Sequence, residues 1–400
     1  MSVGISLIVS IFLCLFSVIV LIPAFVLFIE IGTTLIRQGF KHPDTAMPQR
    51  PFALTVLMPA HNEEKGITDA IRAVLCQLQG NDRILVVADN CTDQTAEVAR
   101  ALGADVIERH DREKRGKGYA LDFGVRWLEK SPPSVTIFID ADCVAQPGSI
   151  ALLAEECITS NRPVQALYLM HATTDSGLSL RIAEFAWLIK NKLRPLGGLV
   201  LGWPCQLMGT GMAFPWPIIV SAPLSTGHLV EDMQLGLDLA KAGTPPLFCP
   251  RAMVTSTFPT DTEGVKSQRT RWEHGHLSML SAVGPQMIWR AAKTRNWSLL
   301  VMALDLMVPP LAALVLLLVV LVSVNTVWWL LTSRAEPLIV SLFATALVLT
   351  SIVVAWVREG RRLVRLSELL AMFWYAAAKV PVYIRLFTKR QVEWVRTKRD

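Results

Sequence analysis

Two things are scarce in this sequence of 400 residues: charge and paired cysteines. Only 18% of the residues are charged and 52% are hydrophobic, a balance too apolar for an ordinary soluble protein and too polar for a bundle of membrane helices. The seven cysteines are scattered, and no two of them form a CxxC pair. This excludes a disulfide framework and a zinc site of that type, and it favours reduced thiols in the cytosol. The length allows one sizeable domain together with membrane spans.

Residues 4–29 contain no charged side chain. A hydrocarbon core about 30 Å thick needs roughly 20 such residues in a helix, so we expect a membrane span within residues 1–32. A cleaved signal peptide is the alternative, but the segment is too long for one and lacks a basic n-region and a small-residue cleavage site. Arg37, Lys41 and Arg50 follow the span, which predicts that the large middle region is cytoplasmic.

Two further charge-poor stretches, 299–322 and 338–357, predict two more spans in the region 299–357. Asp305, Pro309 and Pro310 lie in the first of them. A charge and a proline pair near one end indicate a kinked helix whose entry faces protein rather than lipid.

The end of the sequence, residues 358–400, is basic, with eleven Lys or Arg against four Asp or Glu. Beside apolar segments, such a charge is typical of contact with anionic lipid headgroups. Nucleic acid is not an expected partner, because the basic residues are not gathered on a folded polar domain. Residues 366–387 are apolar but contain charged residues and Pro381, so we expect a helix lying in the membrane interface, followed by a cytoplasmic tail.

The middle region, residues 50–260, alternates short apolar runs with helical patterns. This alternation predicts an α/β domain with a mostly parallel, Rossmann-like sheet. Ligands of such sheets bind beyond the carboxyl ends of the strands. Asn62, Asp89 and Asp140 each lie where a predicted strand ends, and this coincidence locates the candidate site.

Asp140 and Asp142 flank one residue directly after a predicted strand. Alternate side chains share a face of an extended backbone, so the two carboxylates can converge on a divalent cation that bridges diphosphate oxygens. The alternative is a solvated turn in which aspartate is a cap. Asp89 could accept hydrogen bonds from a base edge or a ribose, or could simply cap the next helix.

Lys117 lies between two glycines and could meet a phosphate, although such basic loops are often merely flexible. Glu231 and Asp232 open a helical stretch, where paired acids usually match the helix dipole. Neighbouring acids also raise each other's pKa, and transfer to a hydroxyl needs a base. We therefore assign the base to Asp232, with Glu231 supporting it.

Gln268, Arg271 and Trp272 are three and four positions apart, which places them on one helix face in the expected interfacial helix region 261–298. Arg271 could hold a diphosphate through two hydrogen bonds, and Trp272 offers a flat surface for an acceptor sugar. The alternative is an interface helix whose arginine and tryptophan meet lipid headgroups.

Two other groups complete the candidates. Residues Gly209, Thr210 and Gly211 predict a tight loop on the acceptor side of the site. His274 and His276 are interpreted as polar surface, because nothing else supplies the spacing of a metal site.

Four motifs in one order resemble the family 2 glycosyltransferases with a GT-A fold: PAHNEE at 59–64, DADC at 140–143, the acid pair at 231–232 and QRTRW at 268–272. The resemblance covers roughly residues 50–290. Within the family, the sequence resembles the membrane branch that includes cellulose, hyaluronan and poly-N-acetylglucosamine synthases and ceramide glucosyltransferase. It implies donor binding by Pro59, Asn62, Glu63, Asp89 (uracil), Asp140, Gln268 and Arg271, and Mg²⁺ or Mn²⁺ binding by Asp142 with Asp140. It also implies base catalysis by Asp232 and acceptor binding by Trp272 in the Gln-Arg-Trp motif. Lys117, identified above from its own surroundings, completes the expected donor site.

By this resemblance we expect an inverting, membrane-anchored glycosyltransferase at the cytoplasmic face of the cell (inner) membrane. Its donor would be a nucleotide-diphosphate sugar of the UDP type, and its acceptor a lipid-linked saccharide or a growing polysaccharide. Three spans are fewer than polymer-secreting synthases carry, which favours single transfer. A processive synthase working with a partner subunit is the alternative, and a non-enzymatic nucleotide-binding transport subunit is a further one.

Overall fold

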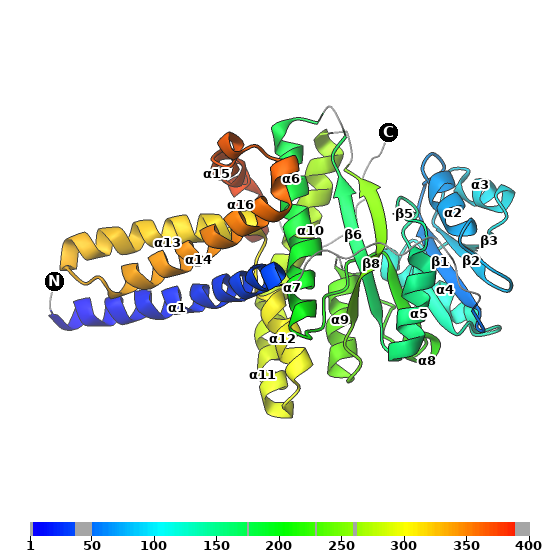
Figure 1. Cartoon of the computed structure of the whole chain (residues 1–400), viewed down its shortest axis with the longest axis horizontal. Helices are drawn as coiled ribbons and strands as arrows, with labels where there is room; N and C mark the ends of the chain where they lie inside the picture. Colours follow the sequence, from blue (N-terminus) through cyan, green and yellow to red (C-terminus); the bar gives the residue numbers. More distant parts are fainter. Residues whose placement is uncertain (1–2, 37–49, 174–175, 229, 259–261, 389–400) are drawn as a thin grey trace.

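The structure, a computed structural model, describes residues 3–36, 50–173, 176–228, 230–258 and 262–388. Figure 1 shows two parts. A sheet covered by helices lies on the right, and long helices project to the left.

Eight strands form one mixed sheet within the described residues, in the order β3-β2-β1-β4-β7-β6-β8-β5. The pairs β1–β2, β1–β4, β2–β3 and β6–β8 are parallel, whereas β7 and β5 pair antiparallel with their neighbours. The predicted α/β fold with a mostly parallel sheet is confirmed. The strands are β1 (Leu54–Ala60), β2 (Arg83–Asp89), β3 (Asp105–Arg109), β4 (Val135–Phe138), β5 (Val144–Ala145), β6 (Val164–His171), β7 (Met212–Pro215) and β8 (Leu247–Thr257).

Helices cover both faces of the sheet, which is why its central strands carry apolar residues on both faces. Val56 and Met58 of β1 belong to a core that includes residues of α2 and α5, whereas Leu57 packs with residues of α4 and α9 on the other face. The helices of this part are α2 (Ile67–Leu75), α3 (Thr95–Ala101), α4 (Lys117–Leu128), α5 (Ser149–Ser160), α8 (Trp216–Ile219) and α9 (Glu231–Lys241).

Among the described residues, three helices are long and apolar enough to cross a membrane: α1 (Val3–Thr33), α13 (Leu311–Thr332) and α14 (Glu336–Arg358). Much of their apolar surface is exposed. Buried polar contacts join them, since the amide of Asn325 donates to Ser17 Oγ at 3.0 Å and the indole of Trp328 donates to Ser10 Oγ at 2.9 Å. Such bonds satisfy polar groups where water is absent.

The expected kinked helix at 299–322 is in fact two helices. The helix α12 (Trp297–Leu306) ends before the proline pair, and α13 begins immediately after it. Pro309 and Pro310 lack the N–H groups that a continuous helix needs, and their rings clash with the preceding turn. The long apolar helix therefore runs over 311–332.

The remaining helices lie between the two parts or above the membrane helices. They are η1 (Thr34–Ile36), α6 (Leu178–Leu188), the π-helical turn η2 (Ile189–Leu193), α7 (Arg194–Val200), α10 (Thr262–Ala282), α11 (Gly284–Thr294), η3 (Gly360–Arg362), η4 (Leu366–Glu368), α15 (Ala371–Ala377) and α16 (Val380–Thr388).

Residues 366–387 do not form the single helix expected from the sequence. The helix α15 ends at Ala377, and Pro381 lies in the first turn of α16. Proline clashes with the carbonyl group four residues earlier, here that of Ala377, so a continuous helix is excluded. The predicted tail residues beyond 388 lie outside the described residues.

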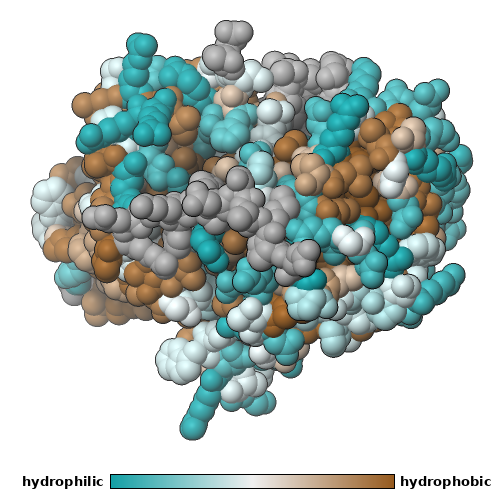
Figure 2. Space-filling model, turned by 45° about the vertical axis from the view of Figure 1, so that its right-hand side comes forward, coloured by the Kyte–Doolittle hydropathy of each residue, from teal (hydrophilic) through white to brown (hydrophobic). Residues whose placement is uncertain are grey.

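The side of the molecule in Figure 2 shows hydrophilic residues over much of its outline, with hydrophobic areas between them. This mixture is ordinary for a domain surface in contact with water.

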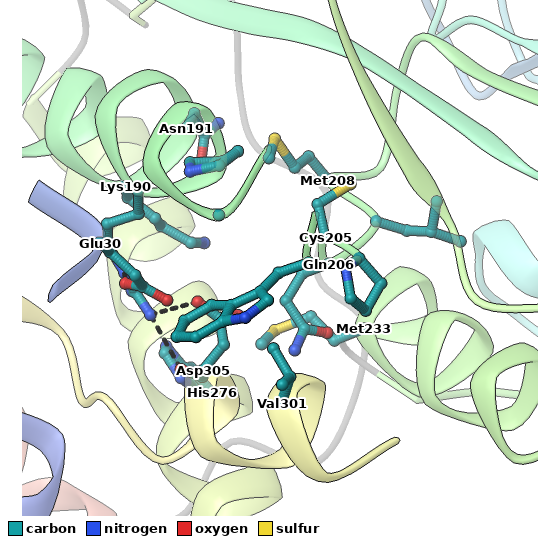
Figure 3. Close-up of a pocket in the computed structure, with 16 residues that line it drawn as sticks. Glu30, Lys190, Asn191, Cys205, Gln206, Met208, Met233, His276, Val301 and Asp305 are labelled. Carbon is teal, nitrogen blue, oxygen red and sulfur yellow. Dashed lines mark hydrogen bonds and ion pairs between the residues drawn. The ribbon is translucent and has the colours of Figure 1, made fainter. Parts of the chain in front are cut away.

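A buried ionic cluster joins the membrane helix α1 to the sheet part, around the cavity drawn in Figure 3. The guanidinium of Arg194 donates from Nε to Glu30 Oε2 at 2.6 Å and from Nη2 to Asp305 Oδ1 at 2.5 Å. Backbones also approach closely here, because a Cβ atom at Gly197 would lie 1.6 Å from the carbonyl oxygen of Glu30. The contact fixes α1 against α7 and α12.

Candidate active site

One large cavity, which we call the polar cavity, lies at the carboxyl ends of β1, β2 and β4 and has a volume of about 960 Å³. It brings together residues from strand ends, from the start of α9 and from α10. Twelve of the residues singled out in the sequence line it: Pro59, Asn62, Glu63, Asp89, Lys117, Asp140, Asp142, Gly209, Glu231, Asp232, Arg271 and Trp272.

Two predicted residues are placed differently, and a third is not described. Thr210 is fully buried, and its hydroxyl accepts a hydrogen bond from the backbone N–H of Asp140 at 3.1 Å. Gly211 has a φ of +66°, and a Cβ there would lie 2.8 Å from the side chain of Ala166. Both therefore support the wall of the cavity from behind, which corrects the expectation that they contact an acceptor. Gln268 lies in α10, and its side chain is outside the described part of the chain.

Asp89 ends β2 and lies opposite Arg109, the last residue of β3. Its carboxylate accepts a hydrogen bond from Arg109 Nη1 at 2.6 Å, and a second from the side-chain amide of Asn90 at 3.0 Å. Burial raises the pKa of Asp89, and the guanidinium of Arg109 opposes that rise. The carboxylate is thus held rigidly at the floor of the cavity.

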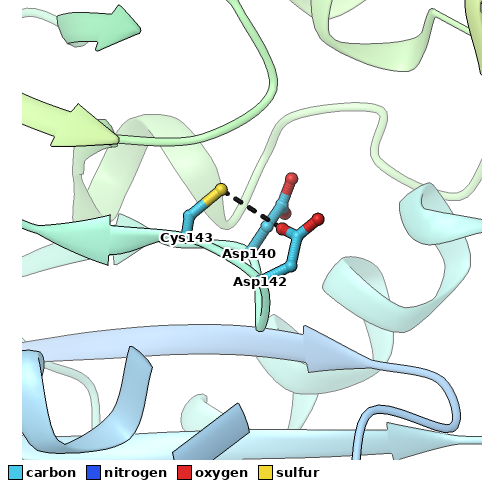
Figure 4. Close-up of side chains that lie close together, drawn as sticks. All are labelled: Asp140, Asp142 and Cys143. Atoms are coloured by element: carbon cyan, nitrogen blue, oxygen red, sulfur yellow. Dashed lines mark hydrogen bonds between the residues drawn. The ribbon is translucent and has the colours of Figure 1, made fainter. Parts of the chain in front are cut away.

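Asp140 and Asp142 lie on the turn after β4, with their carboxylates on the same side of the backbone (Figure 4). One oxygen of each carboxylate and the sulfur of Cys143 lie within 4.8 Å of one another. Burial raises the pKa of Cys143 to about 12, so this group is a neutral thiol, and it donates to Asp142 Oδ1 at 3.2 Å. The two carboxylates are left as oxygen ligands, a set that fits a hard cation such as Mg²⁺ or Mn²⁺.

Lys117 begins α4 and reaches across the cavity. Its ammonium group forms an ion pair with Asp140 and donates to the carbonyl oxygen of Gly209 at 2.7 Å. Burial alone would lower the pKa of Lys117, but the carboxylates of Asp140, Glu231 and Asp232 outweigh it and raise the pKa. The lysine is therefore a fixed positive charge beside the carboxylate pair.

Glu231 and Asp232 form the first turn of α9 and face the same cavity. Burial raises the pKa of both carboxylic acids; each acid's negative neighbours add to this effect, and Lys117 opposes it. Gly209 has a φ of +90°, and a Cβ there would lie 3.5 Å from Asp232 Oδ2 and 3.7 Å from Lys117 Nζ. A glycine at this position leaves room between the acid and the lysine.

Arg271 and Trp272 reach the cavity from α10. Burial lowers the pKa of Arg271, and the negative charges of Glu231 and Asp140 oppose this change, so the guanidinium faces carboxylates. The indole of Trp272 packs on that of Trp187, with ring centroids 5.0 Å apart. Trp187 in turn meets the rings of other buried aromatic residues.

Trp187, Lys190 and Asn191 line the cavity, although they were not candidates from the sequence. With Arg194 they are spaced by three, four and seven positions, the pattern of one helix face. This helical repeat within the stretch 178–201 was the signal that could have identified them.

His274 and His276 are buried, with 1% and 6% of their surfaces exposed, so their interpretation as polar surface is wrong. A ring nitrogen of His274 lies 2.8 Å from the carbonyl oxygen of Val382, and one of His276 lies 3.0 Å from that of Leu306. These contacts attach α10 to α16 and α12. His276 also lines the polar cavity.

Comparisons with known proteins identify a family and a similar fold. The model of the glycosyl transferase family 2 matches residues 55–179, and that of the glycosyl transferase family group 2 matches residues 135–358. The 4,4'-diaponeurosporenoate glycosyltransferase of Staphylococcus aureus (strain USA300) is 38% identical over 93 residues, which are 22% of this chain and 24% of that protein. The chain thus matches only about a quarter of this curated relative's length.

A solved structure has a similar fold. The mannosyltransferase PcManGT from Pyrobaculum calidifontis, in complex with GDP-Man and Mn²⁺, aligns over 93% of this chain and 100% of its own, with a TM-score of 0.51 and 15% identity. This likeness supports the GT-A architecture. Since the second family model covers more than half of the sequence, the chain belongs to the glycosyl transferase family group 2.

Proposed function

We propose that this protein transfers a sugar from a UDP-type nucleotide donor to an acceptor held at a membrane, with inversion at the anomeric carbon. The observation that carries the proposal is the polar cavity, in which Asp140 and Asp142 lie with Lys117 and Arg271 while the acid pair of α9 faces the same space. Carboxylates for a cation, cations for a diphosphate and a base for the acceptor are the groups that this reaction needs.

Positive side chains suit the diphosphate of the donor. Lys117, Arg271 and the exposed residues Arg112 and Arg115 all line the cavity. Arginine and lysine bind phosphate oxygens through charge-assisted hydrogen bonds. We propose that the nucleoside lies toward Asn62 and Asp89, at the ends of β1 and β2.

Asp140 and Asp142 would hold Mg²⁺ or Mn²⁺ in the working enzyme. A bound cation of this kind neutralises charge that develops on the departing diphosphate. Lys117 stabilises the same charge from the protein side. It also holds Asp140 in place through their ion pair.

Asp232 is proposed as the base. As the acceptor oxygen bonds to the anomeric carbon, the bond from that carbon to the diphosphate breaks, and the acceptor's proton passes to the carboxylate. One displacement inverts the configuration. The raised pKa of Asp232 suits the role, because a base works best when its pKa approaches the working pH.

Asn191 is a candidate for positioning a sugar. It lines the cavity and is 1% exposed, and its side-chain oxygen accepts no hydrogen bond from the described residues. A buried polar atom without a partner is costly, and a donor or acceptor hydroxyl would satisfy it.

The three apolar helices support attachment to a membrane, which we propose is the cell (inner) membrane with the sheet part on its cytoplasmic side. The acceptor would be a lipid-linked saccharide, met by Trp272 at the membrane side of the cavity. A growing polysaccharide is the second possibility, with a partner subunit supplying further helices.

The experiment is a donor screen on the purified full chain in nanodiscs. UDP-glucose, UDP-galactose, UDP-N-acetylglucosamine and GDP-mannose are tested with Mg²⁺ and Mn²⁺, and release of the nucleoside diphosphate is measured. We expect metal-dependent turnover of a UDP-sugar. Absence of both turnover and nucleotide binding would overturn the proposal, as would full activity in chelator. Product length on a labelled acceptor then separates single transfer from processive synthesis.

A further inference from the structure

A second cavity, which we call the apolar cavity, lies between the membrane helices and the sheet part and has a volume of about 320 Å³. Its walls come from α6, α10, α13, α14 and α15. Typical wall residues are Leu311 and Val315 of α13, Leu349 and Ile352 of α14, and Phe373 of α15. Two of the three helices suited to crossing a membrane therefore supply much of its lining.

The two cavities meet. Trp187, Lys190, Trp272 and His276 line both of them. The indoles of Trp187 and Trp272, which are tilted by 40° and have their centroids 5.0 Å apart, form the partition. A molecule lying in the apolar cavity would need to pass only these side chains to reach the polar one.

Charge is distributed unequally around the apolar cavity. At its margin, Arg194 is paired with Glu30 and Asp305, and Glu273 is paired with Lys379. Lys190 differs from these residues, because it forms no ion pair with any residue that the structure describes, and its ammonium group lies 5.6 Å from the centre of the Trp187 ring. The passage between the cavities thus offers one positive charge to the polar end of a ligand.

We propose that the apolar cavity binds the hydrocarbon chain of the acceptor, which is therefore an amphiphile with an oxygen nucleophile at the end of its chain. The polar end passes Lys190 and the two indoles and reaches Asp232. This inference rests on the proposed transfer reaction, and it replaces the saccharide acceptors named there with a molecule whose reacting oxygen is carried by the hydrocarbon chain itself.

Two physical reasons favour this occupant. A hydrocarbon chain gains free energy by burial against aliphatic side chains, whereas a saccharide would leave its hydroxyl groups without partners there. Some wall residues also belong to α13 and α14, whose outer faces are apolar and exposed. A lipid can therefore reach the cavity from the bilayer without crossing water.

The reaction balances for either kind of nucleophile. A terminal hydroxyl group gives its proton to Asp232 as the new bond to the anomeric carbon forms and the nucleoside diphosphate leaves. A terminal carboxylate is already ionised and forms the same bond without losing a proton. The shared requirement is an oxygen at the end of a long apolar chain.

The test fills the apolar cavity with a larger side chain and then measures photolabelling by lipid probes and transfer of sugar to them. Val315→Trp places an indole in the apolar cavity. Val320→Trp is the matched control, because Val320 is on the same helix but 61% exposed on its outer side. Ala312→Leu is a milder filling variant of another wall residue. Each variant is reconstituted as the full chain in phosphatidylcholine nanodiscs. The probes are a photoactivatable C16 alcohol, a photoactivatable C16 acid and a soluble oligosaccharide.

We expect the lipid probes to label peptides of α13, α14 and α15, and at least one of them to accept sugar. In Val315→Trp we expect labelling and transfer to fall by about tenfold or more, since overfilling a packed site excludes the ligand. Hydrolysis of the donor should remain within about twofold of wild type. Preference for the alcohol or for the acid identifies the nucleophile, and both results support the proposal.

The proposal is overturned if Val315→Trp and Val320→Trp label and transfer equally, or if the oligosaccharide accepts sugar and neither lipid does. The proposal would also be overturned if phosphatidylcholine from the nanodisc occupied the cavity and the lipid probes could not displace it, because a structural lipid would then fill the cavity. Failure of the wild type to turn over or bind any donor is a different result, which contradicts the proposed function itself.

Discussion

The polar and apolar cavities are neighbours with opposite chemistry. The polar cavity of about 960 Å³ gathers the carboxylates of Asp89, Asp140, Asp142, Glu231 and Asp232 together with several cations. The apolar cavity of about 320 Å³ is lined mainly by aliphatic and aromatic side chains, and apart from Lys190 its charges are paired. The contrast shows how one chain can hold a charged donor and a hydrophobic acceptor within reach of each other.

The two cavities are also built in different ways. The polar cavity is made largely of turns that follow strand ends, so its residues come in short local motifs such as 59–63 and 140–142. The apolar cavity is made by helices that are far apart in the sequence, from α1 to α15. Each can therefore be altered separately, and the following variants test whether the cavities are as independent as their construction suggests.

The largest effect is expected for Asp232→Asn. Loss of a general base lowers the rate by about 10²–10⁴-fold, so transfer to a hydroxyl acceptor such as the C16 alcohol should fall by that factor while nucleotide binding and labelling of the apolar cavity persist. Transfer rates and calorimetric titration with UDP measure the two properties. Asp238→Asn is the control on the same helix, because Asp238 is paired with Lys241 and does not line the polar cavity. Full transfer to the hydroxyl acceptor by Asp232→Asn would refute the assignment of Asp232 as the base.

The next effect is on stability, at the contact between the two parts. Arg194→Met leaves Glu30 and Asp305 without their buried partner. Removing one member of a buried ionic cluster costs about 3–5 kcal/mol, so the unfolding temperature in detergent should fall markedly. The control is Arg181→Met, which breaks a more exposed pair with Glu368 and should change it far less. Equal shifts for the two variants would show that the cluster does not hold the parts together.

Much of the polar cavity was predictable because its residues follow strand ends. Asn62, Asp89 and Asp140 were located by the rule that ligands bind beyond the carboxyl ends of parallel strands, and the structure places all three in one cavity. The acid pair at the start of α9 and the pair on α10 were identified by type and spacing alone. Local sequence carries this information because each motif and its neighbouring strand or helix are adjacent in the chain.

The apolar cavity was not predictable in this way. Its lining depends on how α6, α10, α13, α14 and α15 pack, and an aliphatic residue that faces a cavity looks the same in the sequence as one that faces lipid. The burial of His274 and His276 depends on contacts with Val382 and Leu306, far along the chain. Thr210 was misplaced for a related reason, since only the sheet shows that its hydroxyl faces Asp140.

A moderate effect is expected for Asp142→Asn. One of the two oxygen ligands loses its charge, so the Mn²⁺ concentration that gives half-maximal turnover should rise by roughly tenfold or more. Chelator should abolish turnover of the wild type and excess metal should restore it. Asp105→Asn, on an exposed residue at the start of β3, is the control. The apolar cavity should be unaffected, so photolabelling by the C16 probes should not change. An unchanged metal dependence would argue against a cation at this turn.

The smallest effect is expected for Glu231→Gln, and it concerns how the stability of the protein depends on pH. Burial raises the pKa of Glu231, so the folded state holds this proton more tightly than the unfolded state does. Stability therefore falls as the pH rises from the ordinary pKa of a glutamate to the raised one, because ionising the buried acid then opposes folding. Glu231→Gln removes that step, and we expect a gain of about 1 kcal/mol at neutral pH, together with slower transfer. Melting curves at pH 5 and pH 8, with exposed Glu97→Gln as the control, measure this gain in stability.

Since the apolar cavity has no such acid outside an ion pair among the described residues, Val315→Trp should keep the wild-type dependence of stability on pH. If Glu231→Gln kept that dependence as well, the cost of the polar cavity would have to come from other acids, with Asp232 the first to examine.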